Sequence, residues 1–398
     1  MRREELVAAR EAAGLSQEAL AEAVGVYTST VARWERGEVA PRAGLRADLA
    51  AALGVDLPAL ADLITPPTPA TSAASWSAVL ATAAPAERAP ILAPLMAALM
   101  DYRATTHEPL DADALAAAVL AARADYQATR YAALSERLPV LLLRLPMATA
   151  VSGGRTSALA AAALMTAAGF ALKVGNTSAA TIAADRAMLA AAASGLPAAM
   201  GASARSVVHA LMRTGQHAAA ADLAMAQARL LAGDRDAHTE AVRGALLLRG
   251  AVAAAGAMDR DRSADLVAEA DAIAARVPAT VDGGAGFSSA NVALHRVNLA
   301  VSLGDAGTAL AVARTIDVDT IPLVERRAAL AIDVARAYTQ WGRYEAALDA
   351  LHLAMRIAPE EVRTRRAVAS MVDTLGRAGP PSLRPHVRAY AARMAAAT

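Results

Sequence analysis

The stretch Ser16–Gly37, SQEALAEAVGVYTSTVARWERG, predicts two short helices joined by a tight turn. Ser16 is expected to cap the first helix, because its hydroxyl can accept a hydrogen bond from a backbone N–H of the first turn. Gly25 supplies the positive φ that the turn requires. The small Ala21 lies where the helices cross, and the apolar residues on the facing sides are Leu20, Val24, Val26, Val31 and Trp34. The stretch therefore predicts two packed helices with a fixed crossing.

These residues resemble the helix-turn-helix of the lambda-repressor/Cro type, found in the large family of xenobiotic-response-element-like (XRE) regulators. The segments 10–21, REAAGLSQEALA, and 31–37, VARWERG, match the family pattern nearly residue for residue. The resemblance covers about the first 64 residues and implies a five-helix DNA-binding domain, with further helices near 2–13, 42–53 and 57–63. One departure is Tyr27, where the family usually has a capping Ser or Thr. Either Thr28 takes over the cap or the helix start shifts by one residue.

The resemblance implies that the second helix of the motif docks in the major groove of DNA. Short hydroxyl side chains can contact either kind of base pair, whereas Arg prefers guanine or a phosphate. Gln17 would contact a phosphate and brace the recognition helix. The predicted DNA-binding residues are Gln17, Thr28, Ser29, Thr30, Arg33, Arg36 and Arg42. In the alternative interpretation, Thr30 and Arg33 form only helix surface and backbone contacts.

Two expectations concern the inside of this domain. In the resembled family the residue at the position of Arg10 pairs with the residue at the position of Glu35, which fixes the first helix on the third. The alternative is that both charges are solvated. Trp34 is expected in the core, because it shares an apolar face with Val31.

The charge of this region is low and uneven. Residues 1–64 hold more Asp and Glu than Arg, although Arg33, Arg36, Arg42 and Arg46 cluster after the motif. Phosphate contacts need local positive charge, so the pattern predicts a reader of specific sites and not a general DNA-coating protein. One such module buries little surface, so a homodimer on two half-sites about 34 Å apart is expected.

Composition sets further bounds. A chain of 398 residues predicts two or more domains. It has no cysteine and an N-terminus without an apolar core, which favours a cytoplasmic protein. The uncharged runs 156–172 and 187–204 are rich in Ala, so buried helices are expected and no membrane span. Lys173 is the only lysine, which is interpreted as coding bias and not as function.

Residues 65–86, rich in Pro, Ala, Ser and Thr, predict a linker with a short helical segment near 76–83. From residue 87 to 398, Ala, Leu and Val recur at helical spacing, and no stretch shows sustained alternation. The predicted fold class is therefore all-α: a five-helix domain at 1–64, the linker at 65–86 and a helical repeat domain at 87–398.

Similar turns recur in the C-terminal part, at Gly215, Gly256, Gly304 and Gly342, with a weaker one at Gly376. Their intervals of roughly 34 to 48 residues are typical of a helix-pair solenoid. The clearest unit resembles a tetratricopeptide repeat (TPR) through Ala335, Tyr338, Gly342, Tyr344, Ala347, Leu351, Ala354 and Pro359. The resemblance is fair around Gly215 and Gly304. It is weak at 87–197, where residues 111–138 predict one long helix, either a dimer helix or a degenerate repeat.

The first helix of each predicted pair would line a concave face. Positions counted back from the turns hold Arg205, His209, Arg213, Arg243, Asn291, His295, Asn298, Arg336, Arg363 and Arg366. Arg, His and Asn on one wall suggest a ligand with carboxylate or phosphate groups, or a peptide held by its backbone. The alternative is a solubilising surface.

No motif for polar catalysis appears, and the seven histidines lack partners at metal-ligand spacing. The sequence therefore predicts no enzyme, no cofactor and no metal site. The two-domain plan resembles the peptide-pheromone-responsive regulators. It predicts a bacterial transcriptional regulator that binds double-stranded operator DNA, under the control of a peptide or small-molecule effector in the repeats. In a second interpretation the DNA binding is constitutive and the repeats dock a protein partner. In a third the C-terminal part is a self-regulating enzyme.

Overall fold

The computed structural model describes residues 3–36, 39, 41, 45–64, 88–101, 110–145, 153–278 and 286–396. All regular structure in these ranges is helical, so the predicted all-α class is confirmed. The chain divides into two units, Met1–Ser77 and Ala78–Thr398. The predicted linker at 65–86, its helical segment near 76–83 and Arg42 lie outside the described residues. The two units are described separately below.

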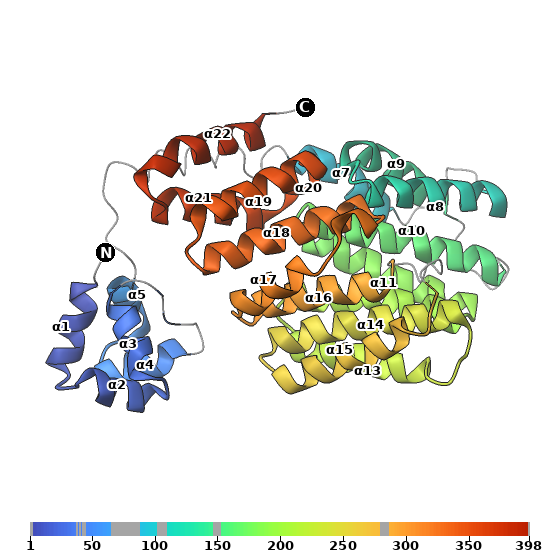
Figure 1. The fold of residues 1–398 in the computed structure, drawn as a ribbon. Helices are drawn as coiled ribbons and strands as arrows, with labels where there is room; N and C mark the ends of the chain where they lie inside the picture. Colours follow the sequence, from blue (N-terminus) through green and yellow to red (C-terminus); the bar gives the residue numbers. More distant parts are fainter. Residues whose placement is uncertain are drawn as a thin grey trace. The chain divides into compact units, whose positions relative to one another are not determined.

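The N-terminal unit contains five described helices: α1 Glu4–Ala12, α2 Gln17–Val24, α3 Thr28–Glu35, α4 Arg46–Leu53 and α5 Leu57–Ile64 (Figure 1). The Ser16 hydroxyl accepts a hydrogen bond of 3.0 Å from the backbone N–H of Ala19, as predicted. Gly25 has φ +71° and ends α2 in the left-handed conformation. The predicted α2–turn–α3 unit is therefore present, held by the cap and the turn that its sequence specifies.

The apolar face of each helix meets in one core. It is formed by Leu6, Leu20, Ala21, Val24, Val31, Trp34, Leu49, Ala50, Leu53, Leu60 and Ile64. Trp34 is only 2% exposed, which confirms its predicted place in the core. The small Ala21, also buried, lets α2 pack closely against α3 and α4. Burial of these apolar groups stabilises helices that are too short to persist alone.

The C-terminal unit consists of helical hairpins followed by a terminal group of helices (Figure 1). Before the hairpins lies α7 Arg88–Leu99. The hairpins pair α8 Ala112–Gln127 with α9 Tyr131–Leu143, α10 Gly154–Lys173 with α11 Thr177–Ser194, α12 Pro197–Arg213 with α13 His217–Leu230, α14 Ala237–Gly256 with α15 Arg260–Ala274, α16 Ser289–Ser302 with α17 Ala306–Arg314, and α18 Val324–Gln340 with α19 Tyr344–Ile357. The terminal group is α20 Pro359–Thr364, α21 Arg366–Ala378 and α22 Arg384–Ala395.

All six hairpins have the same turn, in which three residues separate the two helices and the middle one has a positive φ. These middle residues are Thr129, Gly175, Gly215, Met258, Gly304 and Gly342. In each turn the next backbone N–H bonds to the carbonyl five residues earlier, for example Gln216 to Leu211 at 2.9 Å. This bond satisfies a carbonyl at the end of the first helix. The turns predicted at Gly215, Gly304 and Gly342 are confirmed, and at Gly256 the helix ends but Met258 takes the left-handed conformation.

Two sequence predictions are wrong. Residues 111–138 form two helices and not one, because Thr129 reverses the chain with φ +58°. The buried carboxylate of Asp125 holds this turn by accepting hydrogen bonds from Arg130 (2.8 Å) and Arg137 (2.9 Å). Gly376 is also not a turn, since it is buried inside α21.

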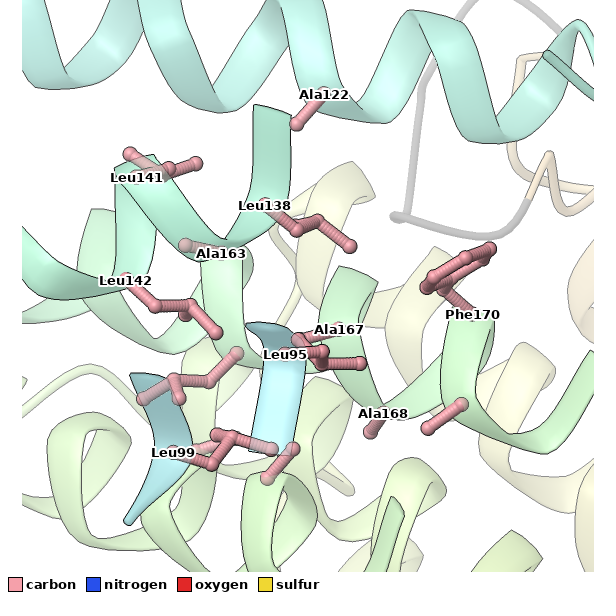
Figure 2. Close-up of a cluster of buried hydrophobic side chains, with 14 of the residues drawn as sticks. Leu95, Leu99, Ala122, Leu138, Leu141, Leu142, Ala163, Ala167, Ala168 and Phe170 are labelled. Atoms are coloured by element: carbon pink, nitrogen blue, oxygen red, sulfur yellow. The ribbon is translucent and has the colours of Figure 1, made fainter. Parts of the chain in front are cut away.

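The first helices of the hairpins form an inner ring, defined here as α8, α10, α12, α14, α16 and α18. Each contacts the next in chain order, and α18 returns to contact α8. Small side chains make this close stacking feasible: the core of the first hairpins includes many buried alanines beside Leu95, Leu138 and Phe170 (Figure 2). The hairpins therefore curl until the sixth meets the first. The TPR resemblance itself stays a prediction.

Helix α10 is the one helix in the described ranges that is long and apolar enough to cross a membrane. Within its most apolar window, 56% of the residues are buried inside the unit. Ala167, Ala168 and Phe170 pack in the core against α8 and α9 (Figure 2). A core helix of a helical domain can be equally long and apolar. The packing of α10 in the core therefore explains its apolar composition.

A buried ionic cluster closes the ring. The ammonium group of Lys173, at the end of α10, lies 2.5 Å from Glu325 of α18 and 2.6 Å from Glu361 of α20. Arg365 also binds Glu361, at 2.5 Å, and the hydroxyl of Tyr131 in α9 donates a hydrogen bond to the same carboxylate. The cluster therefore joins the second hairpin to the chain's C-terminal helices.

Charge pairing keeps this cluster ionised. Burial by itself would raise the pKa of Glu325 and of Glu361, but the nearby Lys173 and Arg365 hold both pKa values below the usual range. The two carboxylates in turn raise the pKa of Lys173 against the effects of burial and of Arg365. Removal of one partner would leave a charge in the interior without compensation, which is costly.

We predict that Lys173→Met destabilises the C-terminal unit by about 3–5 kcal/mol, because two buried carboxylates lose a shared cation. Urea unfolding followed by circular dichroism would show a lower midpoint. Replacing Glu361 by Gln in that variant should restore part of the loss. The control is Arg377→Met, which removes an ion pair from a side chain that is 66% exposed and should cost under about 1 kcal/mol. Equal effects of the two single substitutions would contradict the role given to Lys173.

Candidate functional site

The outer side of α3 is the first candidate site. Thr28, Ser29, Arg33 and Arg36 are exposed there, and Thr30 is half-buried. The opposite side of the helix carries the buried Val31, Trp34 and Glu35. Thr28, Ser29 and Arg33 of this helix therefore face solvent, whereas Val31, Trp34 and Glu35 face the core. Hydroxyl and guanidinium groups thus lie together on the exposed side.

The start of α3 differs from both predicted alternatives for its cap. Tyr27 occupies the N-cap position with extended backbone, and no side chain caps the helix. Thr28 is therefore the first helical residue and not the cap. The first backbone N–H groups of α3 have no capping side chain, and such groups can donate hydrogen bonds to a phosphate.

Tyr27 is a residue whose role the sequence reasoning missed. Its side chain is 83% exposed, directly before the exposed Thr28 and Ser29. A phenol at this place can donate a hydrogen bond to a phosphate or pack against a sugar. The departure from the family pattern was the available signal, because a large aromatic residue stands where a small capping residue is usual.

Buried polar contacts lock the inner side of α3. The Glu35 carboxylate accepts hydrogen bonds from Arg10 Nε and from Gln17 Nε2, both at 2.6 Å. Arg10 also donates to the carbonyl of Leu15 at 2.7 Å. The predicted Arg10–Glu35 pair is confirmed, and Gln17 braces α3 through Glu35. The recognition helix is thereby tied to both α1 and α2.

Arg3 adds a second clamp that the sequence did not indicate. Its guanidinium donates hydrogen bonds of 2.8 Å to the backbone carbonyls of Trp34 and Val39. Its own N–H bonds to the carbonyl of Glu35 at 2.7 Å. Because these carbonyls lie at and after the end of α3, Arg3 neutralises the negative end of the helix dipole there. Burial lowers the pKa of Arg3.

The inner ring of the C-terminal unit is the second candidate site. Arg205 and His209 lie on α12, and His295 lies on α16; all three are half-buried. Arg213, at the end of α12, is exposed. On α16 the neighbouring Asn291 is only 4% exposed, and the Nδ1 atom of His295 lies 2.9 Å from its carbonyl oxygen.

Other predicted ligand residues are engaged with neighbouring helices. Arg243 forms ion pairs with Glu240 at 3.2 Å and with Glu269 of α15. Asn298 and Arg336 both bind Asp333 of α18, each at 2.9 Å. Arg363 is half-buried in α20, and Arg366 is exposed next to Gly175. The structure thus places Arg205, His209, Asn291 and His295 on the inner ring and holds Arg243, Asn298 and Arg336 on carboxylates. The remaining predicted positions, Arg213, Arg363 and Arg366, belong to neither group.

Two residues of the inner ring were missed: Arg249 on α14 and Arg326 on α18. Burial, followed by the charges of Arg249 and Arg326, lowers the pKa of Arg205 to about 9. Burial, followed by Arg326, lowers the pKa of Arg249 to about 10. The charges of the three guanidinium groups therefore act on one another. Counting back from the turn predicted at Gly256 does not find Arg249, because the turn residue is Met258; Arg249 lies nine residues before Met258, as His295 lies nine residues before Gly304.

The histidines beside these arginines are neutral. Burial, followed by the charges of Arg326 and Arg249, lowers the pKa of His295 to about 3. Burial and Arg249 also lower the pKa of His209 well below its usual value. Each neutral imidazole offers one donor and one acceptor. In the described part of the chain, no group of three or more His, Asp or Glu side chains could hold a metal ion.

We predict that Glu35→Ala destabilises the N-terminal unit by about 3–5 kcal/mol, because the buried Arg10 loses its buried counter-charge and keeps only the exposed Glu11. Trp34 reports on this unit directly. Its fluorescence can be isolated by replacing Trp76 and Trp341 with Phe, and followed during urea unfolding. Glu11→Ala is the control, since Glu11 approaches Arg10 only to 3.5 Å from a side chain that is 66% exposed. A Glu35→Ala variant as stable as this control would refute the lock.

The histidines predict a pH dependence of stability. In the unfolded chain they titrate near 6.5, whereas in the folded chain their pKa values are lower. The unfolded state therefore binds more protons below pH 6.5, and stability present above that pH is lost as the pH falls towards 3. The urea midpoint of the C-terminal unit should fall between about pH 7.5 and 5.5. The decline should be smaller in His209→Gln/His295→Gln and unchanged in His386→Gln, which alters an exposed residue of α22.

Comparison with known proteins bears on the first site. A helix-turn-helix family model matches residues 6–60, a range that begins within α1 and ends within α5. A comparison with curated proteins finds no match. The family match agrees with the α2–turn–α3 geometry. Both support the prediction that the N-terminal unit is a helix-turn-helix domain. Residues 6–60 form a helix-turn-helix domain.

Proposed function

We propose that this protein is a sequence-specific DNA-binding transcriptional regulator that reads its operator with α3. The observation that carries the proposal is the division of α3 into two sides. Thr28, Ser29 and Arg33 are exposed, while Glu35 ties the opposite side to Arg10 and Gln17. A rigid helix with exposed hydroxyl and guanidinium groups suits direct contact with base edges in the major groove.

The residues around α3 divide into proposed base and phosphate contacts. Ser29 and Arg33 lie one turn apart on the exposed side, so we assign them to bases. Arg36, at the C-terminal end of α3, and Tyr27, at its N-cap, are placed to contact the flanking phosphates. Gln17 is half-buried with its amide nitrogen on Glu35, so a phosphate contact from Gln17 would be made from a braced side chain. Arg42 completes the proposed set.

Electrostatics favour binding as a homodimer. Residues 1–64 carry ten acidic residues against seven arginines, so attraction to DNA comes only from the local cluster near α3. A single helix in one groove supplies few contacts with DNA. Two copies on adjacent half-sites double the number of these contacts, because each copy binds DNA in the same way. Specificity would then depend on the separation of the two recognition helices.

We further propose that the C-terminal unit is the sensor that controls this separation. Support comes from the inner ring, where the polar Asn291 and His295 of α16 accompany the half-buried Arg205, Arg249 and Arg326 of other helices. A peptide or small acidic molecule bound there can act on DNA binding only through different affinities for two arrangements of the dimer. In the second candidate function the unit is a scaffold that docks a protein partner, and binding to DNA is constitutive.

The first test is selection of bound DNA from a random library by the full chain, followed by fluorescence anisotropy on the enriched site. We predict that Ser29→Ala/Arg33→Ala weakens binding to this site by roughly 100-fold or more, because each base contact contributes about 1–3 kcal/mol. Binding to unrelated DNA should fall much less.

The matched control is Ser370→Ala/Arg314→Ala, which changes the same residue types at exposed positions of α21 and α17. Its affinity for the selected site should equal that of the unaltered chain, and circular dichroism should be the same for both variants. Failure of the library to yield any preferred sequence, or equal affinity of the two variants, would remove the assignment of α3.

A further inference from the structure

Closure of the inner ring brings cations from distant helices to one place. Arg205 lies on α12 and Arg326 on α18, which are separated in the ring by α14 and α16. The two guanidinium groups nevertheless act on each other, and both act on His295 of α16. Arg249 of α14 belongs to the same group. Arg205, Arg249 and His295 lie ten, nine and nine residues before the turn residues of consecutive hairpins, whose first helices contact one another, so these side chains lie at a similar level of the ring. Together with Arg326 they are called the centre of the ring.

Arg249 is a half-buried cation of this centre whose guanidinium group is not fully hydrogen-bonded. Its Nε is buried without a hydrogen-bond partner, and within the described ranges the residue forms no ion pair. Burial of a guanidinium without an anion is costly, and the neighbouring Arg205 and Arg326 add like-charge repulsion. A second buried donor lies nearby: Asn291 is 4% exposed, its Nδ2 has no acceptor, and it precedes His295 by one helical turn.

The two carboxylates of the ionic cluster, those of Glu325 and Glu361, are already bound by cations. Glu325 is shared between Lys173 at 2.5 Å, Arg326 at 3.4 Å and Arg365 at 3.7 Å. Glu361, the other acid of the ionic cluster, is bound by Lys173 and Arg365. Both carboxylates are therefore bound by other cations, and neither forms an ion pair with Arg249.

We propose that this centre binds a small organic anion with at least two carboxylate or phosphate groups, held by Arg205, Arg249 and Arg326, with the side-chain amide of Asn291 as a hydrogen-bond donor. Planar guanidinium groups bind such oxyanions in a bidentate manner. The ring favours a compact ligand over an extended peptide, because α18 meets α8 and the ionic cluster holds the two ends together. The inference rests on the proposed sensor function only for its consequence, the control of DNA binding.

The expected loss of folding stability caused by Arg249 provides the most direct test. Arg249→Met removes one of three mutually repelling half-buried cations, so the full-length variant should unfold at a higher temperature than the unaltered chain when no anion is present. An arginine that merely supports the fold would give the opposite result. Arg314→Met, at an exposed position of α17, is the control and should leave the unfolding temperature unchanged.

Binding is measured on the full chain without DNA, by calorimetry and thermal unfolding, with citrate and pyrophosphate as probes at constant ionic strength. At least one probe should raise the unfolding temperature of the unaltered chain and of Arg314→Met. Affinity should be at least tenfold lower for Arg249→Met and for Arg205→Met. A preference for citrate would identify a polycarboxylate, and a preference for pyrophosphate an organic phosphate. Acetate, with one charge, should bind much more weakly.

Absence of binding by both probes, or equal affinity for Arg249→Met, would overturn the proposed anion site. The same probes are then added to the chain bound to its selected DNA, where the site predicts a change in affinity. Loss of sequence-specific DNA binding without any probe would count against the regulator function and leave the anion site standing. Binding of a probe without an effect on DNA would remove the link between them.

Discussion

The C-terminal unit depends on one buried interaction, the contact of Lys173 with Glu325 and Glu361. The two carboxylates lie 152 and 188 residues further along the chain, yet both are within 2.6 Å of the same ammonium group. Hairpins that merely stacked in sequence would leave the first and last far apart. The ionic cluster, together with the hydroxyl of Tyr131, instead joins them, and the first helices become a ring. Because the ring closes, polar side chains from separate hairpins face one another.

A buried carboxylate has a similar role in the N-terminal unit. Helix α3 has eight residues, which is too short to be stable in isolation. Its position is set by burial of Val31 and Trp34 and by the hydrogen bonds of Glu35 to Arg10 and Gln17. In both units an acid that is almost fully buried selects one arrangement of helices, since any other arrangement would leave its charge unpaired. The exposed side of α3 is then available for the DNA contacts proposed above.

Local sequence was a good guide wherever one residue decides a local conformation. The Ser16 cap, the left-handed Gly25 and the glycine turns at 215, 304 and 342 were predicted because each depends on the conformational freedom or hydrogen bonding of that residue. Thr129 and Met258 take the same conformation without being glycine, so the break within residues 111–138 gave no comparable signal. The opposite error occurred at Gly376, which was predicted to form a turn but lies inside α21. A small residue is equally suited to a buried helix face. The single lysine was set aside as coding bias, because nothing near it in the chain shows the acids it contacts.

The amino-acid sequence by itself determined the all-α class, the helix-turn-helix and the repeated hairpins, because these follow from spacing and from caps within a few residues. The sequence also predicted which side chains lie at the N-terminal end of α3. Tertiary structure alone decided that the hairpins close into a ring, that Lys173 is a buried ionic centre, and that Arg205, Arg249 and Arg326 act on one another. These features depend on groups from helices far apart in the chain, and charge and burial can be assessed only when the helices have been packed.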